Sequence, residues 1–244
     1  MSQLLRPALT VCLLAAAAFA QSGKNYKDPA EYQAYDAVAK DMAANNSAKA
    51  LTDLDAWQKN YPDSEFKDDR QLLYVQAYAA AKQPAKAIDA ATSLLAKQDW
   101  EPANKIKLLF TTAISIQQLP SPTSEQLTTA EKAARQLLTY DQKPEGVSAD
   151  AWSQARKQLQ TAAKDALLYI AFLPGTQAMQ KNDCATAETA FARALGDNPD
   201  NAHAAYELGR AQLCLYKTVP EKASPAIYEF ARAASLDPAN EAFF

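Results

Sequence analysis

The chain has 244 residues, of which 48% are hydrophobic and 22% charged, so it can form one or two packed domains and is too apolar to be disordered. It contains 53 alanines but only five glycines, a balance that favours helices over a many-stranded sheet and predicts an all-α fold. The net charge of −3 favours neither nucleic acid nor an anionic membrane as partner. The chain has a single histidine and no HExxH, GxSxG, GxGxxG or Walker motif, which excludes the common catalytic scaffolds.

Residues 1–20 have the organisation of a secretory signal peptide. Arg6 precedes an apolar run that ends in Ala18-Phe19-Ala20, a small-x-small cleavage pattern, so we expect cleavage after Ala20 and a secreted or periplasmic protein. The run is shorter than the ~20 residues that a membrane span needs. A lipoprotein is the other alternative, but Val11 rather than a small residue precedes Cys12. Residues 21–28 are polar and aperiodic, which predicts a flexible leader.

Two helical hairpins are predicted next, over residues 31–64 and 65–97. In the first, Ala50 is followed four residues later by Leu54, then by Trp57 and by Pro62, which ends the second helix. The second hairpin has apolar residues at helical spacing on both sides of a turn at residues 82–84.

Residues 101–167 are a divergent region. Helices are expected over 103–118 and 124–140, and a long helix should start after Ser148, a suitable N-cap. Pro174-Gly175 should either break this last helix or leave it strained but continuous.

The clearest internal repeat lies in two hairpins over residues 168–201 and 202–240. Both contain A-x-x-x-F-x-x-A followed by proline five residues later. The shared positions are Ala187, Phe191, Ala194 and Pro199 in one unit, and Ala226, Phe230, Ala233 and Pro238 in the other.

This spacing resembles the tetratricopeptide repeat (TPR), a helix-turn-helix unit of ~34 residues. The turn at Tyr61-Pro62-Asp63-Ser64 is also similar to exported bacterial repeat proteins. The resemblance implies an α-solenoid of about five hairpins over residues 29–244. Residues assigned to packing between helices are Ala50, Trp57, Ala87, Ala187, Phe191, Gly209, Ala226 and Phe230.

The resemblance further implies a groove that binds a protein or peptide. The residues at the groove-facing positions are Tyr32, Tyr35, Leu72, Gln76, His203, Tyr206 and Arg210. For each tyrosine the alternative is a ring half-buried between hairpins. Six residues follow Pro238, fewer than a covering helix needs. Either the chain is a fragment, or something else covers the C-terminal hairpin, and self-association through this hairpin is one way to cover it.

Cys184 and Cys214 lie nearly opposite each other if the helices on either side of residues 197–200 pair antiparallel. A disulfide between them is feasible in an oxidising compartment, and two buried, unoxidised cysteines are the alternative. His203 has no second ligand at a metal-binding spacing and is expected at the surface. No metal, cofactor or catalytic site is predicted.

These observations favour a non-catalytic exported scaffold for protein-protein interaction, acting through the groove or the C-terminal hairpin. The alternative is a structural accessory subunit of a cell-envelope or outer-membrane assembly complex, which would stack its C-terminal face on a partner or on itself. The identity of the partner does not follow from the sequence.

Overall fold

The computed structural model describes residues 24–97 and 99–239, and every regular element in these ranges is a helix. The predicted all-α class is confirmed. The signal peptide expected over residues 1–20 lies outside the described residues. The described chain divides into an N-terminal unit, which ends at Leu167, and a C-terminal unit, which begins at Leu168.

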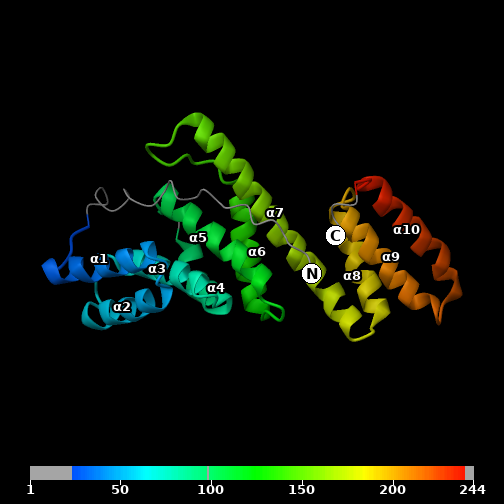
Figure 1. Cartoon of the computed structure of the whole chain (residues 1–244), viewed down its shortest axis with the longest axis horizontal. Coiled ribbons are helices and arrows are strands. Elements are labelled where there is room, and N and C mark those ends of the chain that lie inside the picture. Colours follow the sequence, from blue (N-terminus) through cyan, green and yellow to red (C-terminus); the bar gives the residue numbers. More distant parts are fainter. Residues whose placement is uncertain (1–23, 98, 240–244) are drawn as a thin grey trace. The chain divides into compact units, whose positions relative to one another are not determined.

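The N-terminal unit consists of consecutive helix pairs and the first part of α7 (Figure 1). The pairs are α1 (Pro29–Ala43) with α2 (Ser47–Asn60), α3 (Lys67–Ala80) with α4 (Pro84–Thr92), and α5 (Pro102–Ser115) with α6 (Ser124–Thr139). Short 3-10 turns, η2 (Leu94–Ala96) and η3 (Ile116–Gln118), follow α4 and α5. Contacts also join α2 to α3, and α4 to both α5 and α6, so successive pairs pack on one another.

The C-terminal unit is built from the last part of α7 (Ala149–Gln180) and three further helices. These are α8 (Cys184–Asp197), α9 (Ala202–Tyr216) and α10 (Ala223–Leu236), with the 3-10 turn η4 (Pro220–Lys222) before α10. Its core joins Phe172 from α7 to Phe191 and Leu195 from α8 and Leu208 from α9.

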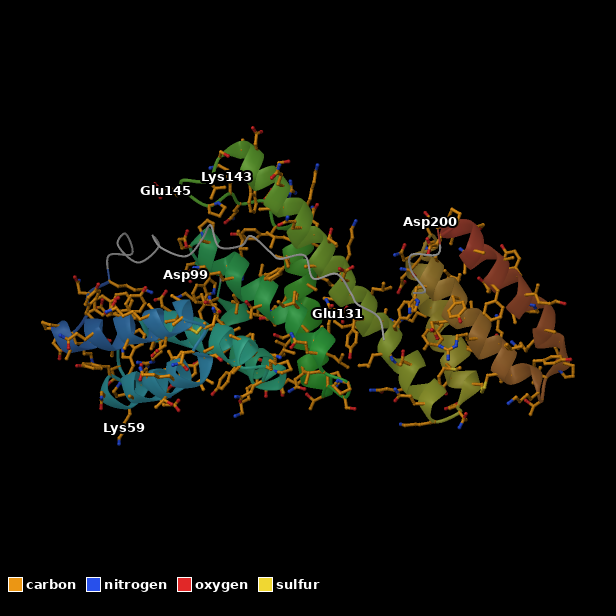
Figure 2. The ribbon with its side chains drawn as sticks, viewed as in Figure 1. Lys59, Asp99, Glu131, Lys143, Glu145 and Asp200 are labelled. Carbon is orange, nitrogen blue, oxygen red and sulfur yellow. A yellow bond between two sulfur atoms is a disulfide. The ribbon has the colours of Figure 1, made fainter. Side chains whose placement is uncertain are left out.

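Local sequence determines where these helices begin. Proline is the first residue of α1, α4 and α5, a position that needs no amide donor. Thr123 and Gln126 form a capping box before α6, and Asp183 and Asn201 accept hydrogen bonds from the first turns of α8 and α9. Charged side chains such as Lys59 of α2, Lys143 and Glu145 extend from the ribbon (Figure 2).

The turns within three hairpins share one backbone feature. Asn45, Lys82 and Asn182 have φ of 57°, 56° and 57°, the left-handed conformation that ends a helix so that the chain can reverse. Pro174, in contrast, lies inside α7, which continues to Gln180. Of the two outcomes expected at Pro174-Gly175, the structure contains the continuous helix.

The segment from Lys24 to Asp28 differs from the expected flexible leader. The Tyr26 ring stacks on Phe66 with centroids 4.3 Å apart, and the Lys24 ammonium pairs with the Asp69 carboxylate. Asp28 caps α1 by accepting the Glu31 N–H at 2.8 Å. These residues therefore pack against the rest of the N-terminal unit, because their aromatic and charged side chains contact residues more than 30 positions further along the sequence.

Gly175 is expected to tolerate no side chain. An added Cβ would lie 2.6 Å from Cε1 of Phe191, a fully buried ring, so Gly175→Ala should lower the free energy of unfolding by about 1–3 kcal/mol despite the higher helix propensity of alanine. Gly196, an exposed residue of α8, has no atom within 4 Å of its added Cβ, and Gly196→Ala should stabilise by up to about 1 kcal/mol. Urea unfolding followed by far-UV circular dichroism measures both; equal stabilisation by the two substitutions would contradict the packing.

Candidate functional site

Three tyrosines cluster at the surface of the first hairpin. The ring centroids of Tyr26 and Tyr32 are 5.3 Å apart, those of Tyr26 and Tyr35 6.0 Å, and those of Tyr32 and Tyr35 6.4 Å. Tyr32 is 52% exposed, whereas Tyr35 is half-buried, with its ring centroid 6.0 Å from that of Trp57 and the two rings inclined at 65°. Tyr32 therefore has the accessibility expected of a groove residue. Tyr35 instead matches the alternative given for these tyrosines, a half-buried ring.

A buried carboxylate holds α1 under this cluster. Glu31 has no exposed surface; its Oε2 accepts the Lys27 N–H at 2.6 Å and its Oε1 accepts the Trp57 indole N–H at 3.1 Å. Burial, the largest effect, would raise the pKa of Glu31, but hydrogen bonds from Ser64, Lys27 and Trp57 together outweigh it and lower that pKa. Glu31 thus fixes α1 to α2 as an ionised acceptor.

The two groove positions on α3 are largely covered. Leu72 is only 3% exposed, so the expectation that it lines an accessible groove is wrong. The reason is that α3 packs against α2, α4 and α5 together, which leaves little of its surface free. Gln76 is half-buried on the same helix.

His203, Tyr206 and Arg210 share one face of α9 in the C-terminal unit. The His203 ring stacks on Phe172 at 5.2 Å and 13° and is half-buried, so it is less accessible than the surface position expected for it. Burial is the main cause that lowers the pKa of His203; Arg210 lowers it further and Glu207 opposes them. Phe172 reaches His203 because α7 continues through Pro174 and joins the core of this unit.

The strip on α9 becomes more accessible toward the C-terminus of the helix. Tyr206 is half-buried beside Phe230, with ring centroids 5.6 Å apart. Nη1 of Arg210 donates to both carboxylate oxygens of Glu207, at 2.9 and 3.1 Å, and the guanidinium remains exposed. Leu213, one turn further on, is 50% exposed. Residues 203, 206, 210 and 213, spaced by three and four, form the surface that we name the α9 strip.

The residues assigned to helix packing lie inside the two units. Ala50, Trp57, Ala87, Ala187, Phe191, Gly209 and Ala226 are buried, and Phe230 is half-buried. At Gly209 an added Cβ would lie 2.9 Å from Cε1 of Phe230 and 3.2 Å from the Ala226 carbonyl oxygen. The absence of a side chain at Gly209 therefore permits the close approach of α9 and α10.

Cys184 and Cys214 form a disulfide that joins the start of α8 to the end of α9, with Cα atoms 5.8 Å apart. Of the two states left open by the sequence, the structure contains the bonded one, and both residues are half-buried rather than buried. A second link, the ion pair between Lys222 and Glu188 at 2.8 Å, connects η4 to α8.

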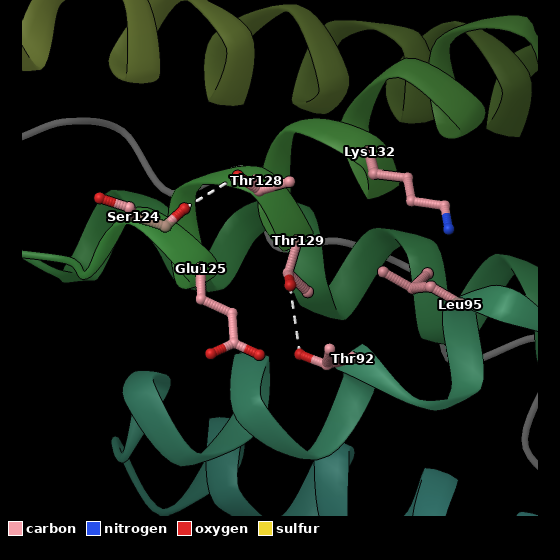
Figure 3. Close-up of a pocket in the computed structure, with 7 residues that line it drawn as sticks. All are labelled: Thr92, Leu95, Ser124, Glu125, Thr128, Thr129 and Lys132. Carbon is pink, nitrogen blue, oxygen red and sulfur yellow. Dashed lines mark hydrogen bonds between the residues drawn. The ribbon is translucent and has the colours of Figure 1, made fainter.

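A hollow that was not predicted from the sequence lies between α4 and α6 (Figure 3). Its volume is about 400 Å³, and its walls carry four hydroxyl groups, one carboxylate and one ammonium group. The hydroxyls of Thr92 and Thr129 are 3.1 Å apart across it. The spacing of Ser124, Thr128 and Lys132 on one face of α6 could have indicated it. The lining residues are Thr92, Leu95, Ser124, Glu125, Thr128, Thr129 and Lys132.

Large exposed hydrophobic side chains concentrate on the last helix pair. Among the described residues six such side chains are exposed, and all except Tyr32 belong to α9 or α10. The most exposed are Ile227 and Tyr228 of α10, at 68% and 64%. Concentrated apolar surface of this kind is typical of protein-protein contact sites. The remaining members are Leu213, Tyr216 and Leu236.

Searches with the whole sequence found no matching protein-family model and no matching curated protein. Within residues 24–97 and 99–239, the helices do not combine the length and the apolar character that crossing a membrane requires. In the same ranges, histidine, cysteine and acidic side chains do not gather in groups of three or more that could hold a metal ion.

Proposed function

We propose that this protein is a non-catalytic, exported scaffold of TPR-like hairpins that binds another protein through the α9 strip. The observation that carries the proposal is the accessible line from Tyr206 to Leu213, where an aromatic ring, a guanidinium and an exposed leucine lie along one helix face. Such a combination offers apolar contact together with a polar group that fixes orientation, as protein-binding surfaces do.

Polar contacts that span about one repeat length support the repeat; one of them closes the first hairpin, and the other two join the last two hairpins. The Tyr61 hydroxyl donates to Asp28 across 33 residues, the Lys222 ammonium to Glu188 across 34, and the Arg232 guanidinium to the Pro199 carbonyl across 33. Each separation is close to the ~34 residues of one TPR unit. The two contacts of Lys222 and Arg232 are those expected where each unit binds only its neighbours in a solenoid.

The experiment that tests the proposal places a photoreactive benzoylphenylalanine at position 213 of the full chain in its native cell. We expect one discrete cross-linked protein at this position and none when the photoreactive residue replaces Lys59, an exposed residue of α2. Leu213→Glu should reduce recovery of that protein at least tenfold, because a carboxylate would replace the apolar contact. Its unfolding curve should match the wild type, since Leu213 is half exposed. Equal cross-linking at both positions, or recovery unaffected by Leu213→Glu, would place the binding surface elsewhere.

A further inference from the structure

The outer face of α10 carries no charged side chain and is formed by hydrophobic residues and two serines. The inner face packs on α9 through Ala226, Phe230 and Ala233. Of the two charged residues of the helix, Glu229 is 9% exposed, and Arg232 lies at the edge of the outer face, where its guanidinium donates to the Pro199 carbonyl oxygen at 2.7 Å. The side chains exposed on the opposite side are Ser224, Ile227, Tyr228, Ala231, Ala234 and Ser235, which we name the α10 face.

Side-chain size on the α10 face changes along the helix. The large residues Ile227 and Tyr228 lie before Ala231, and the small residues Ala234 and Ser235 lie after it. In a two-fold arrangement each residue i that opposes j is matched by j opposing i. With the axis at Ala231, Ile227 opposes Ser235 and Tyr228 opposes Ala234 of the second copy. Large side chains then meet small ones throughout, so the face is complementary to itself.

We propose that the α10 face binds the same face of a second copy of this chain, with the two helices antiparallel and the two-fold axis at Ala231. Charge favours the same arrangement. No like charges oppose each other on the face, and antiparallel pairing brings the positive end of each helix dipole beside the negative end of the other. A parallel arrangement would instead place Ile227 and Tyr228 against their own copies and leave the small residues facing one another across a gap.

The surface available sets the expected strength of the dimer. A helix of 14 residues is about 21 Å long, so one face of α10 is smaller than the ~800 Å² per partner of a standard stable interface. We therefore expect a reversible dimer whose population rises with concentration in the micromolar range. This association is independent of the proposed partner-binding function, which uses the α9 strip.

Cysteine cross-linking of the full chain tests both the surface and its symmetry. Packed helix axes are about 8–10 Å apart and each Cα lies about 2.3 Å from its axis, so residues at the two-fold point come within disulfide range. Ala231→Cys should therefore give a covalent dimer under mild oxidation. The matched control is Ser224→Cys on the same exposed face. Its two copies would be 14 residues of helix apart, about 21 Å, and should give no dimer.

Sedimentation velocity over a concentration series provides the second measurement. The wild-type chain should dimerise, Tyr228→Glu should weaken the dimer at least tenfold, and Leu213→Glu should leave it unchanged. A wild-type monomer at all concentrations, or equal cross-linking of Ser224→Cys and Ala231→Cys, would overturn the proposal. If the wild type stays monomeric but a chain ending at Ala239 dimerises, residues 240–244 occupy the face instead. Loss of partner capture in Leu213→Glu with an intact dimer would separate this proposal from the proposed function.

Discussion

Replacing Glu31 by alanine is expected to lower the free energy of unfolding of the N-terminal unit by about 3–5 kcal/mol. The substitution removes the acceptor for the Trp57 indole N–H and the Lys27 N–H at a site with no exposed surface. Each buried donor left without an acceptor destabilises by about 1–3 kcal/mol, and the cavity left by the side chain adds to this. Urea unfolding of the full chain, followed by tryptophan emission, measures the change. Trp57, Trp100 and Trp152 all lie in the N-terminal unit, so the emission reports on that unit.

Two variants control this prediction. Asp36→Ala removes an acidic residue from the same helix, but its partner Lys40 is exposed, so the effect should stay within about 0.5 kcal/mol. Glu31→Gln should fall between the two, because its amide keeps one acceptor oxygen and turns a donor toward the other N–H. A Glu31→Ala variant no less stable than Asp36→Ala would show that the network does not stabilise the fold.

The lowered pKa of Glu31 adds a dependence on pH. Because hydrogen bonds hold this pKa below its ordinary value, its contribution to stability is complete above that value and is lost as pH falls through the pKa of the folded state. The wild-type N-terminal unit should therefore lose stability below about pH 4 more steeply than Glu31→Gln.

Loss of the Cys184–Cys214 disulfide should destabilise the C-terminal unit by about 3–4 kcal/mol. The bond closes a loop of 30 residues, and the restriction it places on the unfolded chain accounts for an effect of this size. The Cys184→Ser, Cys214→Ser double variant should unfold earlier when followed by far-UV circular dichroism, which reports on all helices. Wild-type protein treated with reductant should behave like the double variant.

Tryptophan emission provides an internal control for the disulfide. The C-terminal unit contains no tryptophan, so the emission transition should keep its midpoint in the double variant while the circular dichroism transition shifts. A circular dichroism curve that neither substitution nor reductant moves would show that the bond does not contribute to stability.

Much of the helical pattern could be predicted because it depends on local residues. The turns at Asn45 and Lys82 and the helix ends before Pro199 and Pro238 follow from left-handed backbone conformations and from prolines that cannot continue a helix. Pro174 left two outcomes open, because its effect depends on tertiary contacts; there, Phe172 and Ala178 on either side of it both pack in the core of the C-terminal unit.

The candidate site was harder to predict, because exposure depends on which helices pack together. Leu72 and Tyr32 were both predicted to face the groove, yet α3 has neighbours on several sides and α1 has fewer, so Leu72 is buried and Tyr32 exposed. The packing of Tyr26 and the stacking of His203 on Phe172 likewise join residues more than 30 positions apart. The α10 face, in contrast, could have been found from the sequence as a run of uncharged residues at helical spacing.

The link between Cys184 and Cys214 also determines how the protein would respond to mechanical force. When the ends of the chain are pulled apart, the covalent bond carries the tension and the residues it encloses stay out of the stretched path. Thirty residues at about 3.3–3.6 Å each correspond to roughly 100 Å of contour length. In a single-molecule pulling experiment the oxidised protein should extend by that much less than the reduced one, and part of the α8–α9 hairpin should remain shielded from load.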